Sequence, residues 1–232
     1  MIGRIFLAAL VAGLLAGIFV SGAQMLKVVP LIHMAEQYEG ETPAPAAHSH
    51  DSATTDDHHH HGDAWAPEDG FERAAYTVLT NILVGVGYGL LLAAGMSLRG
   101  QLVGWRNGII WGGCGYLAFS FLPALGLPPE LPGMAAGDLG GRQIWWLMTS
   151  VASVGGIALI LLSSKWAFRA LGAALLIIPH FVGAPHPHEF GGGVPAELAA
   201  QYVTASLVTT GLFWILLGAL VGQFIDRGLR GE

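Results

Sequence analysis

Residues 74–98, AAYTVLTNILVGVGYGLLLAAGMSL, form a long run between Arg73 and Arg99 that contains no Asp, Glu, Lys or Arg. A helix of about 20 apolar residues crosses the hydrocarbon core of a bilayer, which is roughly 30 Å thick. The run is longer than this. It therefore predicts a transmembrane helix, and it sets the pattern to look for in the rest of the chain.

Five further windows of the same kind are bounded by Arg4 and Lys27, Arg106 and Glu130, Arg142 and Lys165, Arg169 and Glu189, and Glu197 and Asp226. The composition agrees, since 53% of the residues are hydrophobic and only 11% are charged. One soluble core of this size would not bury so much apolar surface. We expect an all-α integral membrane protein, a compact bundle of about six transmembrane helices.

Two windows carry special features. The first has a second interpretation as a secretory signal peptide, because Ser21-Gly22-Ala23 resembles a cleavage site. Its apolar run exceeds the roughly 7 to 15 residues of a signal core, which favours a membrane span. The fifth contains Pro179, which we expect to shorten this helix to roughly 14 to 18 residues.

Four G-x-x-x-G pairs lie in these windows, at Gly13/Gly17, Gly85/Gly89, Gly108/Gly112 and Gly218/Gly222. Small residues at this spacing let two membrane helices approach closely. The pairs therefore predict tight helix packing, although the pattern is common in membrane proteins and names no function.

Basic residues predict the orientation, because those near span ends stay on the cytoplasmic side. With the N-terminus inside, the cytoplasmic group is the larger, Arg4, Arg99, Arg106, Lys165, Arg169, Arg227 and Arg230, against Lys27, Arg73 and Arg142 outside. We expect both termini in the cytoplasm. The chain then divides into a first helix (1–27), an external loop (28–75), and a five-helix bundle (76–232) with a second external loop at 184–198.

All ten histidines lie in or beside these two external loops. The first loop also contains ten of the sixteen carboxylates, with no Lys or Arg between Lys27 and Arg73. Its residues 40–63 are poor in large apolar side chains, so we expect a disordered, anionic segment that concentrates cations. Imidazole and carboxylate bind divalent metals, and the candidate ligands here are His48, His50, His58, His59, His60 and His61. An inert, solvated spacer is the alternative.

The second histidine segment, IIPHFVGAPHPHEF at 177–190, is rigidified by proline. An extended backbone there would point His186 and His188 to one face, and Glu189 would add an oxygen or orient a ring N–H. His180 stands at the end of the fifth span, where an imidazole is costly unless it is used or paired. The candidate metal ligands are His180, His186, His188 and Glu189; the alternative for His180 is a helix cap at the headgroups.

A path through the membrane is less evident, because no span contains Asp or Glu. A deep relay would depend on Asn81, Gln143, Cys114, hydroxyls, methionines or backbone carbonyls. The chain also contains no G-x-x-x-x-G-K-[ST] phosphate loop. We therefore expect no nucleotide to power the chain by this means. We also expect no nucleic acid among its partners. The partners we expect are the lipid bilayer and, as an open alternative, further copies of the chain.

Two sequence blocks point to a family. The blocks are W-x-P-x-D-G-x-E-R-x-x-Y-T at 65–77 and PHFVGAPHPHE at 179–189. With the apolar N-terminal span and the histidine-bearing insert, they resemble CbtA, the predicted cobalt transporter subunit of bacteria, along nearly the whole chain. The resemblance implies a multi-pass protein of the bacterial inner membrane, linked to cobalt supply for cobalamin synthesis and accompanied by CbtB, a smaller single-span companion with its own histidines.

We expect transport of Co²⁺ and not enzymatic activity. Ni²⁺ and Zn²⁺ stay open as the ion, because ligand type alone does not name the metal. An accessory metal-binding subunit that delivers ions to a partner permease is the first alternative. A membrane metalloenzyme or haem protein using His180 and His33 is the second.

Overall fold

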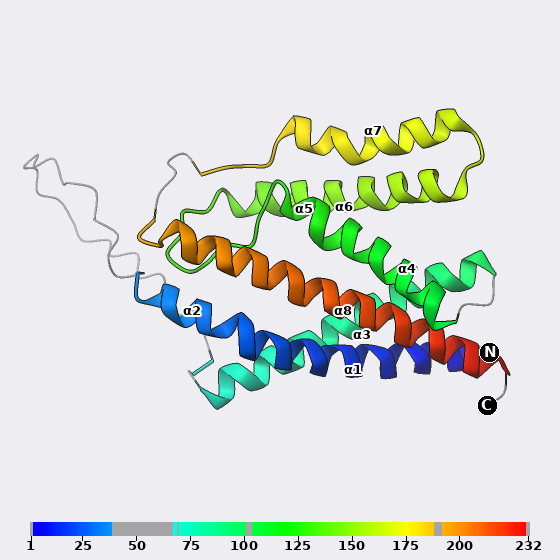
Figure 1. Ribbon diagram of the computed structural model, residues 1–232, viewed down its shortest axis with the longest axis horizontal. Coiled ribbons are helices and arrows are strands. Elements are labelled where there is room, and N and C mark those ends of the chain that lie inside the picture. Colours follow the sequence, from blue (N-terminus) through cyan, green and yellow to red (C-terminus); the bar gives the residue numbers. More distant parts are fainter. Residues whose placement is uncertain (1, 39–66, 69, 101–103, 188–191, 231–232) are drawn as a thin grey trace, which may run out of the picture.

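The uncharged runs of the sequence are helices in the computed structural model (Figure 1). The structure describes residues 2–38, 67–68, 70–100, 104–187 and 192–230, and all regular elements in these ranges are helical. Four helices are long and apolar enough to cross a membrane: α1 (Ile2–Lys27), α3 (Phe71–Arg99), α6 (Leu139–Leu162) and α8 (Ala196–Arg230). The all-α membrane class expected from the sequence is confirmed. Residues 40–63, expected to be disordered, lie outside the described residues.

The other two windows are helical but shorter. The third consists of α4 (Trp105–Tyr116), a π-helical turn η2 (Leu117–Phe121) and α5 (Leu122–Ala124), which follow one another without a break. The irregular turn ends two residues before Pro123, which has no N–H to donate to a helical carbonyl. The fifth window is α7 (Trp166–Val182), whose 17 residues give a helix about 26 Å long. Its length agrees with the shortening expected from Pro179, although the helix continues past the proline to Val182.

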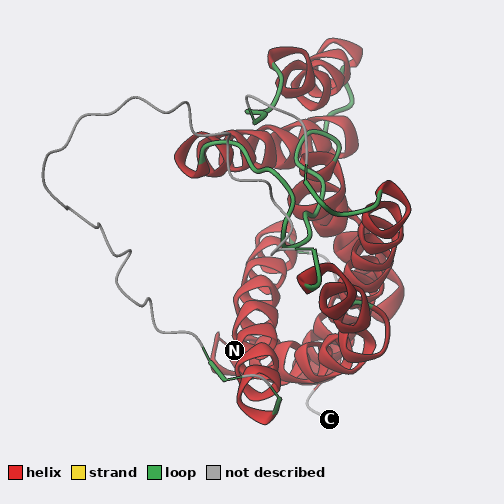
Figure 2. Cartoon of the chain, turned by 90° about the vertical axis from the view of Figure 1, so that its left-hand side faces the viewer, coloured by secondary structure: helices red, strands yellow, loops and turns green. Residues whose placement is uncertain are grey.

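Long antiparallel helices run along the molecule, and both termini lie at the same end (Figure 1). A short helix, α2 (Val29–Glu36), follows α1 at the other end. Figure 2, turned to face that end, shows the loops between helices gathered around it. Asp138 begins α6 there, because its carboxylate accepts a hydrogen bond of 2.7 Å from the N–H of Gly141.

The core lies where α1 packs against α3 and α8, and it combines small residues of α1 with larger buried side chains of α8, such as Trp214 and Leu217. Ala9, Ala12 and Ala16 are completely buried. A Cβ atom on Gly13 would lie 2.5 Å from the Cα of Val86, and one on Gly17 would lie 2.6 Å from the Cα of Ile82. The backbones of α1 and α3 are therefore in contact, as the glycine spacing predicts.

Helices α4 and α8 approach just as closely. A Cβ on Gly218 would lie 2.7 Å from the backbone N of Gly112, and one on Gly222 would lie 2.8 Å from the carbonyl oxygen of Gly104. A side chain larger than hydrogen at either glycine would push the two helices apart. All four predicted G-x-x-x-G pairs thus lie at these two helix interfaces.

Large apolar side chains project outward from the long helices. More than half exposed are Leu7, Leu83, Ile110, Met148, Phe181 and Val208. A water-soluble protein rarely exposes so much contiguous apolar surface, whereas lipid tails solvate it. The exterior therefore fits a bundle surrounded by bilayer.

We expect Gly112→Leu to destabilise the bundle by about 1–3 kcal/mol or more, because the added side chain meets the backbone of α8. The matched control is Gly113→Leu, since a Cβ on Gly113 meets nothing within 4 Å. Thermal unfolding in detergent, followed by circular dichroism, measures the difference. Equal melting temperatures for the two variants would contradict the close contact between α4 and α8.

Candidate metal-binding site

Several segments distant in the sequence meet at one end of the bundle, which we call the histidine end; it comprises α2, residues 131–138 and residues 183–187. The backbone of Met134 pairs with that of Gly192 in an isolated β-bridge. A Cβ on Gly193 would lie 3.1 Å from the carbonyl oxygen of Tyr38. Tyr38, in the first external loop, therefore lies close to Gly193, in the second.

The second histidine segment lies over the start of α6. A Cβ on Gly137 would lie 2.9 Å from the carbonyl oxygen of Pro185, and one on Gly141 would lie 3.2 Å from its ring. Glycine at these two positions lets residues 183–187 pack directly against α6. His186, in this segment, is exposed, whereas His188 and Glu189 lie outside the described residues.

His180 lies in the last turn of α7 and faces α6. Its ring lies edge-on to that of Trp145, with the ring centroids 5.9 Å apart and the planes at 67°. The indole N–H of Trp145 donates to the carbonyl oxygen of Pro179 at 3.3 Å, which anchors the end of α7 to α6. The Nε2 atom of His180 is buried and makes no hydrogen bond. Because a buried polar atom without a partner is costly, this nitrogen is a vacant candidate ligand.

The described residues contain no group of three or more His, Cys, Asp or Glu side chains that could hold a metal ion. Of the ten predicted ligands, only His180 and His186 are among them. The other eight, His48, His50, His58, His59, His60, His61, His188 and Glu189, lie outside the described residues. The histidines within the described part of the chain are therefore, at most, part of a ligand set.

Two of the polar side chains considered for a deep relay have other surroundings. The amide of Asn81 donates to Ser21 Oγ at 3.0 Å and to Gln24 Oε1 at 2.7 Å, which ties α3 to α1. Cys114 is half-buried and lines an apolar pocket of about 300 Å³. Neither side chain is arranged with other ligands for a cation.

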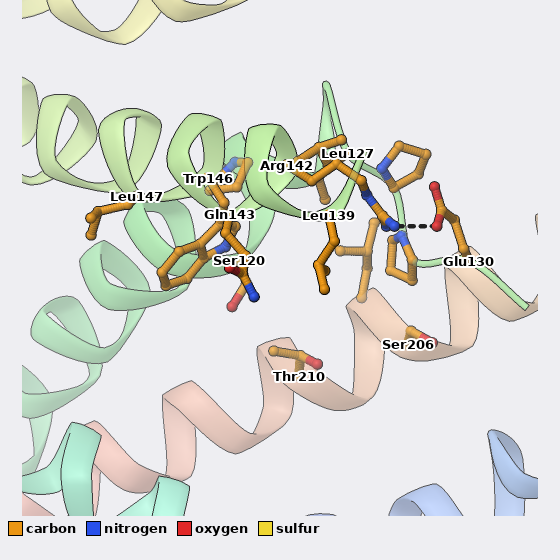
Figure 3. A pocket seen from close by; sticks show the side chains of 15 residues that line it. Ser120, Leu127, Glu130, Leu139, Arg142, Gln143, Trp146, Leu147, Ser206 and Thr210 are labelled. Carbon is orange, nitrogen blue, oxygen red and sulfur yellow. Dashed lines mark hydrogen bonds and ion pairs between the residues drawn. The ribbon is translucent and has the colours of Figure 1, made fainter. Parts of the chain in front are cut away.

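Gln143 lines a larger cavity of about 660 Å³ between α6, α8 and the segment that follows α5 (Figure 3). Arg142 and Glu130 form an ion pair of 2.6 Å on its wall, and Ser206 and Thr210 face it from α8. The guanidinium neutralises the carboxylate, so the cavity is a poor trap for cations. Sequence reasoning missed this pair, because the two residues were taken only as the limits of neighbouring windows.

The comparison with known families agrees with the sequence blocks. A family model described as "Probable cobalt transporter subunit (CbtA)" matches residues 2–226. The chain belongs to the CbtA family. No curated protein and no solved structure matches it. CbtA membership makes this chain a membrane protein and a probable cobalt transporter subunit, and the word subunit implies a partner.

The first CbtA block joins α2 to α3. Arg73, within that block, donates to Glu36 Oε1 at 2.7 Å, and the ring of His33 bonds to Glu36 Oε2 at 2.9 Å. The hydrogen bond with His33 has the larger effect and that with Arg73 the smaller, and together they hold the pKa of the Glu36 carboxyl below its usual range. The charged carboxylate thus fastens α2 to the start of α3.

We expect this fastening to weaken in acid. A carboxyl whose pKa is lowered by folding stabilises the protein above its ordinary pKa of about 4.3, and that stability is lost as the pH falls through the lower folded value. Melting temperatures of the wild type and Glu36→Gln should therefore differ most near neutral pH and converge toward pH 3. A constant difference across this range would contradict a role for the Glu36 charge.

Proposed function

We propose that this CbtA protein carries Co²⁺ across the bacterial inner membrane, with its histidine end outside and both termini in the cytoplasm. The observation that carries the proposal is the buried, unpartnered Nε2 of His180 in a membrane protein of a cobalt transporter family. The position of the termini at the end opposite α2 supports the orientation derived from the basic residues (Figure 1).

Capture would begin in the first histidine loop, where His48, His50 and His58 to His61 stand beside carboxylates that attract cations. The ion would then pass toward the bundle through the second histidine segment, bound in turn by His186, His188, Glu189 and His180. Imidazole and carboxylate suit first-row divalent ions, so Ni²⁺ and Zn²⁺ are the competing substrates. No nucleotide takes part in this scheme.

The membrane potential would supply the driving force. A potential of about 100 mV, negative inside, favours the inward movement of a divalent cation by roughly 4.6 kcal/mol, twice the figure for one charge. This is enough for modest accumulation without ATP.

An accessory role is the second candidate, favoured by the description of the family as a subunit. In that case the chain would bind the ion and deliver it to a partner permease. A CbtB-like companion with a single span, or a second copy of the chain, could cover the exposed apolar side chains of α7, such as Phe181.

Uptake of radioactive Co²⁺ into proteoliposomes that contain this chain alone separates the two roles. We expect uptake by the wild type, loss in His186→Ala/His188→Ala, and a weaker response at low metal concentration when residues 48–61 are deleted. The same preparations with Ni²⁺ and Zn²⁺ measure selectivity. If the wild type binds Co²⁺ but does not take it up, the accessory role replaces the transporter.

Metal binding should also depend on pH, because imidazole binds a metal only when it is neutral. Between pH 8 and pH 5 we expect Co²⁺ affinity to fall as the pH drops through about 6.5. Isothermal titration at a series of pH values measures this. A flat profile would mean that carboxylates and not histidines hold the ion.

A further inference from the structure

Three hydroxyl groups on α6 are buried without a hydrogen-bond partner. Thr149, Ser150 and Ser153 are each 1% exposed, and none of their side-chain oxygens makes a hydrogen bond. Buried polar groups are nearly always paired, and an unpaired one in a native protein points to an ion, a water or a catalytic role. In a membrane the cost is not relieved by bulk solvent.

Among the described residues, Ser206 on α8 is also buried without a partner, but five hydroxyls on the other helices are satisfied within their own helix. Ser21, Thr77, Ser97, Thr204 and Thr209 each donate to the carbonyl four residues earlier, at 2.6 to 2.9 Å. This local bond is the usual way for a helix to satisfy Ser or Thr. The α6 hydroxyls are turned away from it, so helix geometry alone does not account for them.

Thr149 and Ser153 lie on the face of α6 that meets α7. The two helices touch at Trp145 and His180, and again at Gly156, where a Cβ would lie 2.7 Å from the carbonyl oxygen of Gly172. Positions 145, 149, 153 and 156 follow one another at helical spacing, so they share one face. The two hydroxyls therefore continue inward from His180 in steps of about 6 Å.

Helix α7 offers these hydroxyls no side-chain partner. Between Gly172 and His180 it carries only Ala, Leu, Ile and Pro. Pro179 lacks the N–H that would otherwise bond to the carbonyl of Leu175. The Leu175 side chain packs against α6, since its Cδ1 is 3.9 Å from the position of a Cβ on Gly155. An imidazole nitrogen and two hydroxyl oxygens, each buried without a hydrogen-bond partner, thus follow one interface.

We propose that the α6–α7 interface is the path of the cation through the outer half of the membrane, with His180 Nε2, Thr149 Oγ1 and Ser153 Oγ as successive ligands. This inference rests on the proposed function. Imidazole and neutral oxygen ligands suit a partly hydrated first-row divalent ion. Because the oxygens carry no charge, they bind it weakly enough to release it to the next site.

The two cavities described above are weaker candidates for this path. In the larger one, the Glu130 carboxylate is already neutralised by Arg142 at 2.6 Å. The smaller one is lined mainly by apolar side chains such as Trp111, Phe119 and Trp214. Among the described buried side-chain atoms without a partner, only Ser206 Oγ belongs to a residue lining the larger cavity, and none belongs to a residue lining the smaller one.

The first test replaces the hydroxyls without changing the packing. We expect Thr149→Val/Ser153→Ala to lower Co²⁺ uptake into proteoliposomes by about tenfold or more, with no loss in melting temperature. The matched control is Thr209→Val, whose hydroxyl is buried but donates to its own helix, and its uptake should equal that of the wild type. Unchanged uptake in the double variant would overturn the path.

The second test does not depend on uptake. In a Cys114→Ala background, which removes the one native cysteine, Ser153→Cys should react with a small water-soluble methanethiosulfonate, and Co²⁺ should slow the reaction. Val151→Cys is the control, because Val151 is 62% exposed on the outer surface and should stay unreactive in lipid. An unreactive Ser153→Cys, or one that Co²⁺ does not protect, overturns the path. If Co²⁺ protects Ser153→Cys but the wild type shows no uptake, the ion site stands and only self-sufficient transport is rejected.

Discussion

Backbone contact at glycine is the constraint on which the rest of this structure depends. In lipid, helices gain little from burying apolar side chains against one another, so close packing and polar contacts hold them together. Glycine on both sides of the α4–α8 contact, as at Gly112 and Gly218, lets the two backbones meet. Glycine on α1 does the same against α3. Small residues of α1 line the core beside large buried side chains such as Trp214, while many other large apolar side chains face outward.

Helices α6 and α7 also make a backbone contact at glycine, but at one point only. Gly156 and Gly172 bring the two backbones together. At the histidine end the contact is made instead by the rings of Trp145 and His180 and by the indole bond to Pro179. The interface between these two points holds unpaired polar atoms. Membrane transporters often place their sites at short or interrupted helices, and α7 is short and contains Pro179 near its end.

Much of the fold could be predicted because the signals are local. A span of uncharged residues and a glycine repeated after four positions are properties of one helix, and they predicted the helices and the glycine faces that pack closely. Which helices these faces join, α1 with α3 and α4 with α8, came from the structure. The short helix α2 and the π-helical turn before Pro123 were not predicted. Both elements involve only a few residues within a longer apolar stretch, where the hydrophobic pattern does not mark their boundaries.

The sequence by itself determined that the chain is a helical membrane protein with its histidines gathered in two segments, because hydrophobic length and residue type need no partner to be recognised. Only the tertiary structure decided that Trp145 donates a hydrogen bond to Pro179, that Glu130 forms an ion pair with Arg142, and that the hydroxyl of Thr149 has no hydrogen-bond partner. Each of these facts is a relation between residues on different segments. Whether a polar group is satisfied depends on what the fold places beside it, and that is a property of the packed bundle.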